Sequence, residues 1–140
     1  MKLFLDANVI FSAAHQAEGR AQHLVALARA GHCTLVASAH AIEEARRNLE
    51  LKSRGFAARL AAALAIIGTV PEAPRNLVAW AAAEGLPAKD APILAAAAHC
   101  DAQLLVTGDA RDFGPLYGRT LRGVKIVTPA QALAAVLALD

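Results

Sequence analysis

The sequence of 140 residues is poor in aromatic residues, in cysteine and in charge, and each shortage excludes a class of protein. Aromatic side chains make up 4% of the chain, so platforms on which single-stranded nucleic acid could stack are scarce. The two cysteines, Cys33 and Cys100, form no C-x-x-C pair, which argues against a redox motif or a thiolate metal site. With only 19% charged and 56% apolar residues, the chain is not a disordered protein.

Long apolar runs are also missing. The run from Leu60 to Ile67 is far shorter than the ~18 to 20 residues that cross a bilayer. Asp6 and Asn8 interrupt the segment that would form the apolar part of a signal peptide. We therefore expect a cytoplasmic protein that does not contact a membrane. The formal net charge of +2 is too small to indicate nucleic-acid binding by itself.

Apolar segments typical of strands alternate with helical segments along the chain. Strands are predicted at residues 2–6, 33–38, 102–109 and 123–127, and helices at 7–15, 20–30, 39–52, 56–67, 74–84, 90–98 and from 128 onward. Strands separated by helices form parallel sheets that are covered on both faces. The sequence thus predicts an α/β fold: a three-layer α/β/α sandwich around a parallel sheet of four to five strands, in one domain over residues 1–140.

Four carboxylates occupy strand ends or helix starts. Asp6 closes the first predicted strand and Asp109 the third, Asp90 opens a helix, and Glu44 lies in the helix after the second strand. Functional residues of open α/β sheets gather beyond the carboxyl ends of the strands. Two such charges at ~4 Å repel by about 4 kcal/mol at an effective dielectric constant near 20, so a cluster needs protons or a cation.

Oxygen ligands of this kind suit Mg²⁺ or Mn²⁺. Asn8 and the hydroxyl group of Thr107 are placed to support the carboxylates. A metal with a few protein ligands keeps positions for water and a substrate phosphate, so the pattern indicates metal-assisted phosphodiester hydrolysis.

Simpler roles compete with this interpretation. Asp6 and Asp90 could each serve as a helix N-cap. Asp112, in the segment ARDF, is predicted to be a turn or cap residue and not a ligand.

The choice between two adjacent glutamates depends on helix spacing. Glu43 stands four residues before Arg47, which predicts an exposed ion pair. Glu44 has Asn48 at the corresponding position and lies beside Ala41 and Ala45, which suggests an inward face. Glu44 is therefore the better ligand candidate.

Three segments, FLDANVIFSAA, LVASAHAIEEARRNL and PAKDAPILAAAAHCDAQLLVTGDARDFG, together resemble the PIN domain, a metal-dependent ribonuclease fold that includes the VapC-like toxins of bacterial toxin–antitoxin pairs. The likeness runs from Lys2 to about Thr128. It implies that Asp6, Glu44, Asp90 and Asp109 are the catalytic metal ligands, with Asn8 and Thr107 in support. It also implies Mg²⁺ or Mn²⁺ as cofactor, RNA as substrate, a homodimer, and inhibition by a small antitoxin protein.

Basic residues flank the predicted site on both sides. Arg46, Arg47, Lys52, Arg54 and Arg59 lie on the long helix and its successor, and Arg111, Arg119, Arg122 and Lys125 lie between the third and fourth strands. Arg46, Arg47 and Arg111 are the candidates for RNA phosphate contact, and Arg111 is favoured because it follows Asp109 closely. The alternative is an ordinary solvated surface.

Two other functions remain open. A non-catalytic PIN-like protein-binding module would use the acidic pocket to capture a basic side chain of a partner. A phosphoaspartyl phosphohydrolase would also place an aspartate after its first strand. That chemistry needs a second acid two residues later, where this chain has Asn8.

Overall fold

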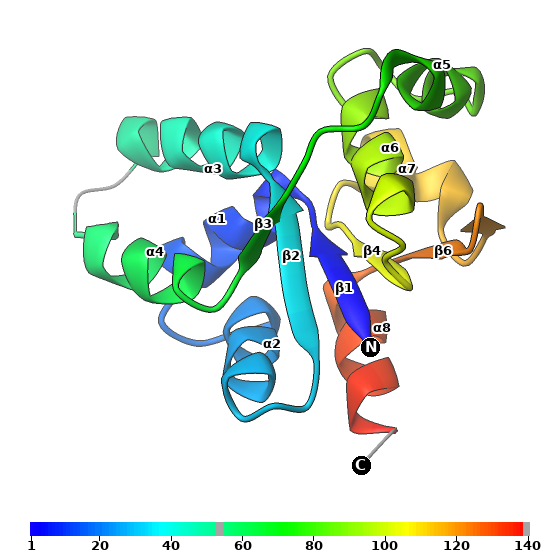
Figure 1. The fold of residues 1–140 in the computed structure, drawn as a ribbon. Coiled ribbons are helices and arrows are strands. Elements are labelled where there is room, and N and C mark those ends of the chain that lie inside the picture. Colours follow the sequence, from blue (N-terminus) through cyan, green and yellow to red (C-terminus); the bar gives the residue numbers. More distant parts are fainter. Residues whose placement is uncertain (53–54, 139–140) are drawn as a thin grey trace.

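A six-stranded sheet forms the centre of the molecule in a computed structural model that describes residues 1–52 and 55–138 (Figure 1). Its order is β3-β2-β1-β4-β6-β5. β1 pairs in parallel with β2 and β4, β2 with β3, and β4 with β6, whereas β5 runs antiparallel to β6. The strands are β1 (Lys2–Leu5), β2 (Thr34–Ser38), β3 (Gly68–Val70), β4 (Leu104–Val106), β5 (Thr120–Leu121) and β6 (Val124–Val127).

Helices cover both faces of this sheet. Crossovers run one way from β1 to β2 and the opposite way from β3 to β4, so right-handed connections place their helices on opposite faces. No helix within the described ranges is long and apolar enough to cross a membrane. The helices are α1 (Ala7–His15), α2 (Arg20–Arg29), α3 (Ala39–Lys52), α4 (Ala57–Leu64), α5 (Arg75–Ala83), α6 (Ala91–His99), α7 (Ala110–Phe113) and α8 (Pro129–Leu137), with a 3₁₀ turn at Gly114–Leu116.

The three-layer α/β prediction is confirmed, with six strands in place of four to five. The two strands that lie outside the four predicted segments, β3 and β5, are short. β3 lies just beyond a helix that was predicted to reach Ile67 but ends at Leu64, and it pairs at the edge with β2. β5 forms a hairpin with β6 through Arg122 and Gly123, whose φ angles of 48° and 82° fit a two-residue turn of type I′.

The core is built on the central strands. Leu3 and Phe4 of β1 and Leu105 of β4 are fully buried. These strands are apolar along their length because helices cover both faces of the sheet. Ala95 and Ala96 of α6 are also fully buried, and their small side chains let that helix lie close to the sheet.

The connections around β1 and β4 create the candidate site. The chain leaves β1 toward β2, whereas β4 pairs on the other side of β1 (Figure 1). The ladder continues past the strand ends: the backbone N–H of Asp6 donates to Val106, and that of Thr107 donates to Val127, both at 3.0 Å. Reversals of this kind open a crevice at the carboxyl edge of a sheet, where ligands bind in open α/β folds.

Candidate metal centre

Asp6 is held rigidly at the end of β1. Its side chain is 3% exposed, and one oxygen, Oδ1, accepts the N–H of Ala7 at 2.7 Å as the N-cap of α1. The other oxygen, Oδ2, accepts the Thr107 hydroxyl at 2.8 Å and the Asn8 amide at 3.0 Å. Asp6 can therefore cap α1 and also belong to a functional site, because its two carboxylate oxygens have different partners.

Asn8 and Thr107 join the first turn of α1 to the loop after β4. Asn8 Oδ1 accepts the backbone N–H of Gly108 at 2.7 Å, and its amide nitrogen also lies 3.3 Å from Thr107 Oγ1. Thr107 Oγ1 accepts the N–H of Asp109 at 3.1 Å, while the Tyr117 hydroxyl donates to the Thr107 carbonyl at 2.8 Å. This network fixes Asp6 relative to the loop that carries Asp109.

Asp90 approaches the same region from the start of α6. It occupies the N-cap position, but its side chain makes no capping hydrogen bond. Pro92 follows in the first turn, as predicted. The residue is 7% exposed, and its buried Oδ2 has no hydrogen-bond partner among the described residues. A buried carboxylate oxygen without a donor is costly, so this atom requires a proton or a cation.

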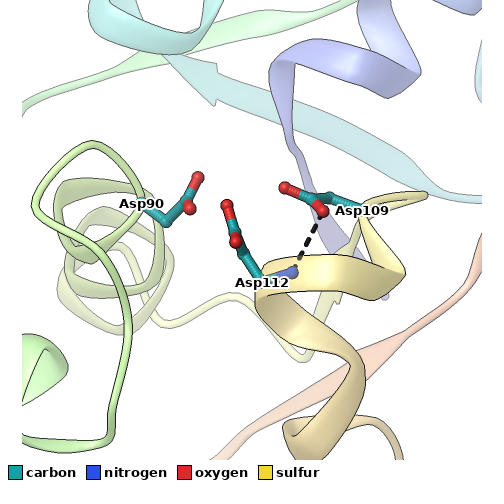
Figure 2. A group of neighbouring side chains, drawn as sticks. All are labelled: Asp90, Asp109 and Asp112. Atoms are coloured by element: carbon teal, nitrogen blue, oxygen red, sulfur yellow. Dashed lines mark hydrogen bonds between the residues drawn. The ribbon is translucent and has the colours of Figure 1, made fainter.

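Asp90, Asp109 and Asp112 form a close carboxylate group, with one oxygen from each lying within 4.8 Å of the others (Figure 2). Asp109 caps α7 by accepting the N–H of Asp112 at 3.1 Å. Asp112 is predicted to be a turn or cap residue; it lies in the first turn of α7, but the side chain of Asp109 supplies the cap, and the carboxylate of Asp112 points toward Asp90 (Figure 2). Two residues three apart at the start of a helix lie on one side of it, which brings both carboxylates to Asp90.

Glu44 contributes a further carboxylate to this region from α3. A pocket of about 320 Å³ is lined by residues that include all four predicted carboxylates, Asp6, Glu44, Asp90 and Asp109. We call it the acidic pocket. The neighbouring Glu43 forms its ion pair with Arg46 at 3.1 Å, and not with Arg47 as its spacing predicted. Of the two glutamates, Glu44 lines the acidic pocket.

Lysines line the same pocket. Lys89 Nζ lies 3.4 Å from Asp112 Oδ2. Lys52 and Asn48 line the pocket on successive turns of α3 after Glu44, and the Lys52 ammonium group lies 5.5 Å from the ring centroid of Phe11. The acidic pocket therefore has cationic groups at its border that could contact an anionic ligand.

The predicted RNA-contacting arginines divide into several environments. Arg111 borders a shallow cavity of about 350 Å³ beside Lys89 and Asp109, next to the acidic pocket. Arg46 borders a different cavity, between α3 and α4, and Arg47 is exposed. Arg59 instead binds the carbonyl oxygens at the end of α1, and Arg54 lies outside the described residues.

Burial and mutual repulsion dominate the electrostatics of the carboxylates. The pKa of Asp90 is raised to about 7, first by burial and then by the adjacent Asp112 carboxyl, through a hydrogen bond and its charge. The pKa of Asp112 is lowered, first by the hydrogen bond with Asp90 and then by Lys89. Burial also raises the pKa of Asp6, and the charge of Glu44 raises it further. The three hydrogen-bond donors to Asp6 lower this pKa but do not cancel the effect of burial. At pH values below about 7, the one proton that Asp90 and Asp112 share therefore resides on Asp90.

A family model for the PIN domain matches residues 2–111 of the sequence. The chain belongs to the PIN domain family. Within the match lie Asp6, Glu44, Asp90 and Asp109, in the order expected from the resemblance. A search of curated protein sequences gave no significant match.

Solved structures agree with the PIN fold. VapBC2 from Rickettsia felis, bound to a DNA fragment from its promoter, aligns with a TM-score of 0.66 and 17% identity over 91% of this chain and 98% of that chain. PAE2754 from Pyrobaculum aerophilum aligns with a TM-score of 0.68 and 20% identity over 99% and 90%. FitAcB from Neisseria gonorrhoeae aligns with a TM-score of 0.58 and 20% identity over 91% and 98%. At these identities the comparison establishes the fold.

Sequence reasoning missed several residues of this PIN site. Asp112 could have been found from its spacing to Asp109, and Asn48 from its spacing of four residues to Glu44. Lys89 precedes Asp90 directly, but adjacent residues usually point apart, so only the fold shows that Lys89 reaches Asp112. Tyr117 carries no local signal, because its bond to Thr107 depends on the turn after α7.

Proposed function

We propose that this PIN domain is an endoribonuclease that depends on Mg²⁺ or Mn²⁺ and acts as the toxin of a toxin–antitoxin pair. The observation that carries the proposal is the buried Oδ2 of Asp90, which has no donor among the described residues and lies within a group of carboxylates. Nothing in ordinary helix capping accounts for such an atom. A divalent cation would satisfy it.

The donor set fits such a cation. Asp90, Asp109 and Asp112 offer only oxygen ligands, and Asp6 and Glu44 line the acidic pocket together with Asp90 and Asp109. Hard oxygen ligands at a partly open site suit Mg²⁺ or Mn²⁺ better than a soft metal. We assign Asp6, Glu44, Asp90 and Asp109 as the principal ligands, with Asp112 available as a further oxygen donor.

The cation would activate a water molecule and shield the charge that develops on the phosphate during attack. The chain's own residues prepare this chemistry. Thr107 and Asn8 hold the Asp6 carboxylate in one orientation, and Asp109 is fixed by its bond to Asp112. Lys89 and Arg111 line one cavity beside Asp109, where they can bind phosphate groups of the RNA next to the acidic pocket.

Two isosteric variants test the assignment. Asp90→Asn removes a ligand charge from a side chain whose Oδ2 has no hydrogen-bond partner among the described residues, and Asp109→Asn keeps an oxygen that can cap α7. We expect both to fold and to lose Mn²⁺-dependent cleavage of single-stranded RNA by more than about a hundredfold. Asp101→Asn is the matched control, because Asp101 is exposed at the opposite end of α6, about 15 Å from Asp90. Cleavage that survives in both pocket variants would refute the proposal.

Calorimetry with Mn²⁺ separates the nuclease from the protein-binding module. A nuclease should bind Mn²⁺ in a manner lost in Asp90→Asn, whereas a module that captures a basic side chain of a partner should bind no metal. The phosphohydrolase alternative predicts a phosphorylated Asp6, but the second acid that this chemistry needs two residues later is replaced by Asn8.

The proposed toxin role brings two further expectations, a small antitoxin partner and a homodimer. They are supported by the resemblance to VapC-like toxins and by the VapBC and Fit structures that share the fold. Solution mass measurement tests the dimer. Co-purification with the product of an adjacent short reading frame, followed by recovery of RNA cleavage when that product is removed, tests the antitoxin.

A further inference from the structure

We propose that a second cavity, between α1, α2 and the start of α8, binds the nucleotide that follows or precedes the one held at the acidic pocket. This inference rests on the proposed ribonuclease function and assigns a substrate-binding subsite to it. The cavity has a volume of about 600 Å³, within the usual range for small-ligand sites. We call it the α1–α2 pocket.

The two pockets share a wall. Asn8 lines both of them, and Gly108 lines the α1–α2 pocket on the same side. The hydrogen bond of 2.7 Å from Gly108 N–H to Asn8 Oδ1 holds this wall in place. A Cβ atom at position 108 would lie 3.3 Å from Asn8 Oδ1, so glycine lets the backbone at this position lie close to the Asn8 side chain. A chain of nucleotides leaving the acidic pocket past Asn8 would enter the α1–α2 pocket directly.

The charge of the α1–α2 pocket is opposite to that of the acidic pocket. Arg20 and His23 line it from adjacent turns of α2, and Ser12 and Gln16 line it from the side of α1. Among the described residues that line it there is no carboxylate. Arginine and neutral hydrogen-bonding groups suit a phosphodiester and a ribose, which need no bridging cation there.

The remaining lining suits the sugar and base. Val9 and Ala21 are buried and supply an apolar surface, and Pro129 adds its ring from the first turn of α8. A pocket with an apolar floor and convergent polar groups holds an amphipathic ligand such as a nucleoside. Because no Phe, Tyr or Trp is among its described lining residues and His23 offers only a small ring, we expect little discrimination by stacking.

Three substitutions at accessible positions test the subsite: Arg20→Ala, His23→Ala and Gln16→Glu. All three residues are exposed, so the fold should tolerate the changes. Arg29→Ala is the control. Arg29 is exposed at the other end of α2, about 13 Å along the helix from Arg20. It changes the net charge by the same amount as Arg20→Ala and Gln16→Glu.

Two readouts are used. The first is the fluorescence anisotropy of a labelled single-stranded oligoribonucleotide of mixed sequence, with each substitution in an Asp90→Asn parent that leaves RNA intact. We expect Arg20→Ala to weaken binding about tenfold and to reduce the salt slope of the binding constant by about one, as for one lost phosphate contact. The second is steady-state cleavage with Asp90 intact, where KM should rise several-fold and kcat should change little.

The outcomes separate this inference from the proposed function. If the protein cleaves RNA but the three variants behave like Arg29→Ala in both readouts, the α1–α2 pocket is not a subsite and the nuclease assignment stands. If the variants weaken RNA binding although no protein cleaves RNA, the subsite stands and the nuclease assignment fails. RNA that neither binds nor is cleaved overturns the inference.

Discussion

Replacing Asp90 by asparagine should stabilise the metal-free protein at neutral and alkaline pH while it abolishes activity. The carboxylate of Asp90 is buried, faces Asp112 and has an oxygen without a described partner. Burial and Asp112 together raise its pKa from 3.8 to about 7. Asparagine has the same shape without a charge, so the variant removes the repulsion and leaves the packing unchanged.

The sign of the pH dependence follows from proton binding. Between pH 4 and pH 7 the folded protein keeps a proton on Asp90 that the unfolded chain releases, so the free energy of unfolding decreases as pH rises through this range. The shift from 3.8 to about 7 corresponds to roughly 4 kcal/mol at most. Because the acidic pocket opens to solvent and Lys89 is near, we expect roughly 1 to 2 kcal/mol.

Urea unfolding at pH 5 and pH 8, with a chelator present, measures this effect. The wild-type protein should lose stability between the two pH values, Asp90→Asn should lose less, and the control Asp101→Asn should follow the wild type. Mn²⁺ at one hundred times its dissociation constant should then stabilise the wild type by about 2.7 kcal/mol and leave Asp90→Asn unchanged. A pH dependence that is identical in wild type and Asp90→Asn would refute the electrostatic reasoning.

Two further variants probe contacts around the site. Thr107→Val removes the hydroxyl that donates to Asp6 at 2.8 Å and should lower the free energy of unfolding by about 1 to 3 kcal/mol in urea, whereas Thr107→Ser should retain most of it. An unchanged stability in Thr107→Val, together with a loss in Thr107→Ser, would show that packing of the methyl group and not the hydroxyl bond is responsible. Arg59→Ala removes the hydrogen bonds to the last carbonyls of α1 and should lower the free energy of unfolding by about 1 kcal/mol, whereas Arg29→Ala should leave it unchanged. If Arg59 has only this structural role, its replacement should not change the affinity for RNA.

The layers of the fold were predictable from sequence because their signals are local and repeated. Gly31, with a φ of 90°, ends α2 as expected, and Thr128 begins α8 with a capping box to Gln131. The edge strands were not predictable in the same way. β3 is stabilised mainly by pairing with β2, and β5 by the turn at Arg122 and Gly123, so neither has a long apolar pattern of its own.

For the site, the sequence predicted which residues lie close together but not how their side chains are oriented. The ends of parallel strands and the starts of the following helices converge by topology, which is why Asp6, Glu44, Asp90 and Asp109 line one pocket. The orientation of each carboxylate depends on partners far away in sequence. Thr107 lies 101 residues from Asp6, and Asp112 lies 22 residues beyond Asp90, so pairings of this kind carry no spacing signal.

The carboxylates of the acidic pocket differ in how their charge is compensated, and this difference assigns them different tasks. Asp6 receives three protein hydrogen bonds and needs no cation to keep its orientation. Asp90 receives none at its buried oxygen and shares a proton with Asp112 in the absence of a cation. A metal ion would therefore displace that proton, and its affinity should increase with pH up to about 7. In the proposed nuclease, Asp6 would set the geometry of the pocket, and Asp90 would couple metal binding to the release of a proton.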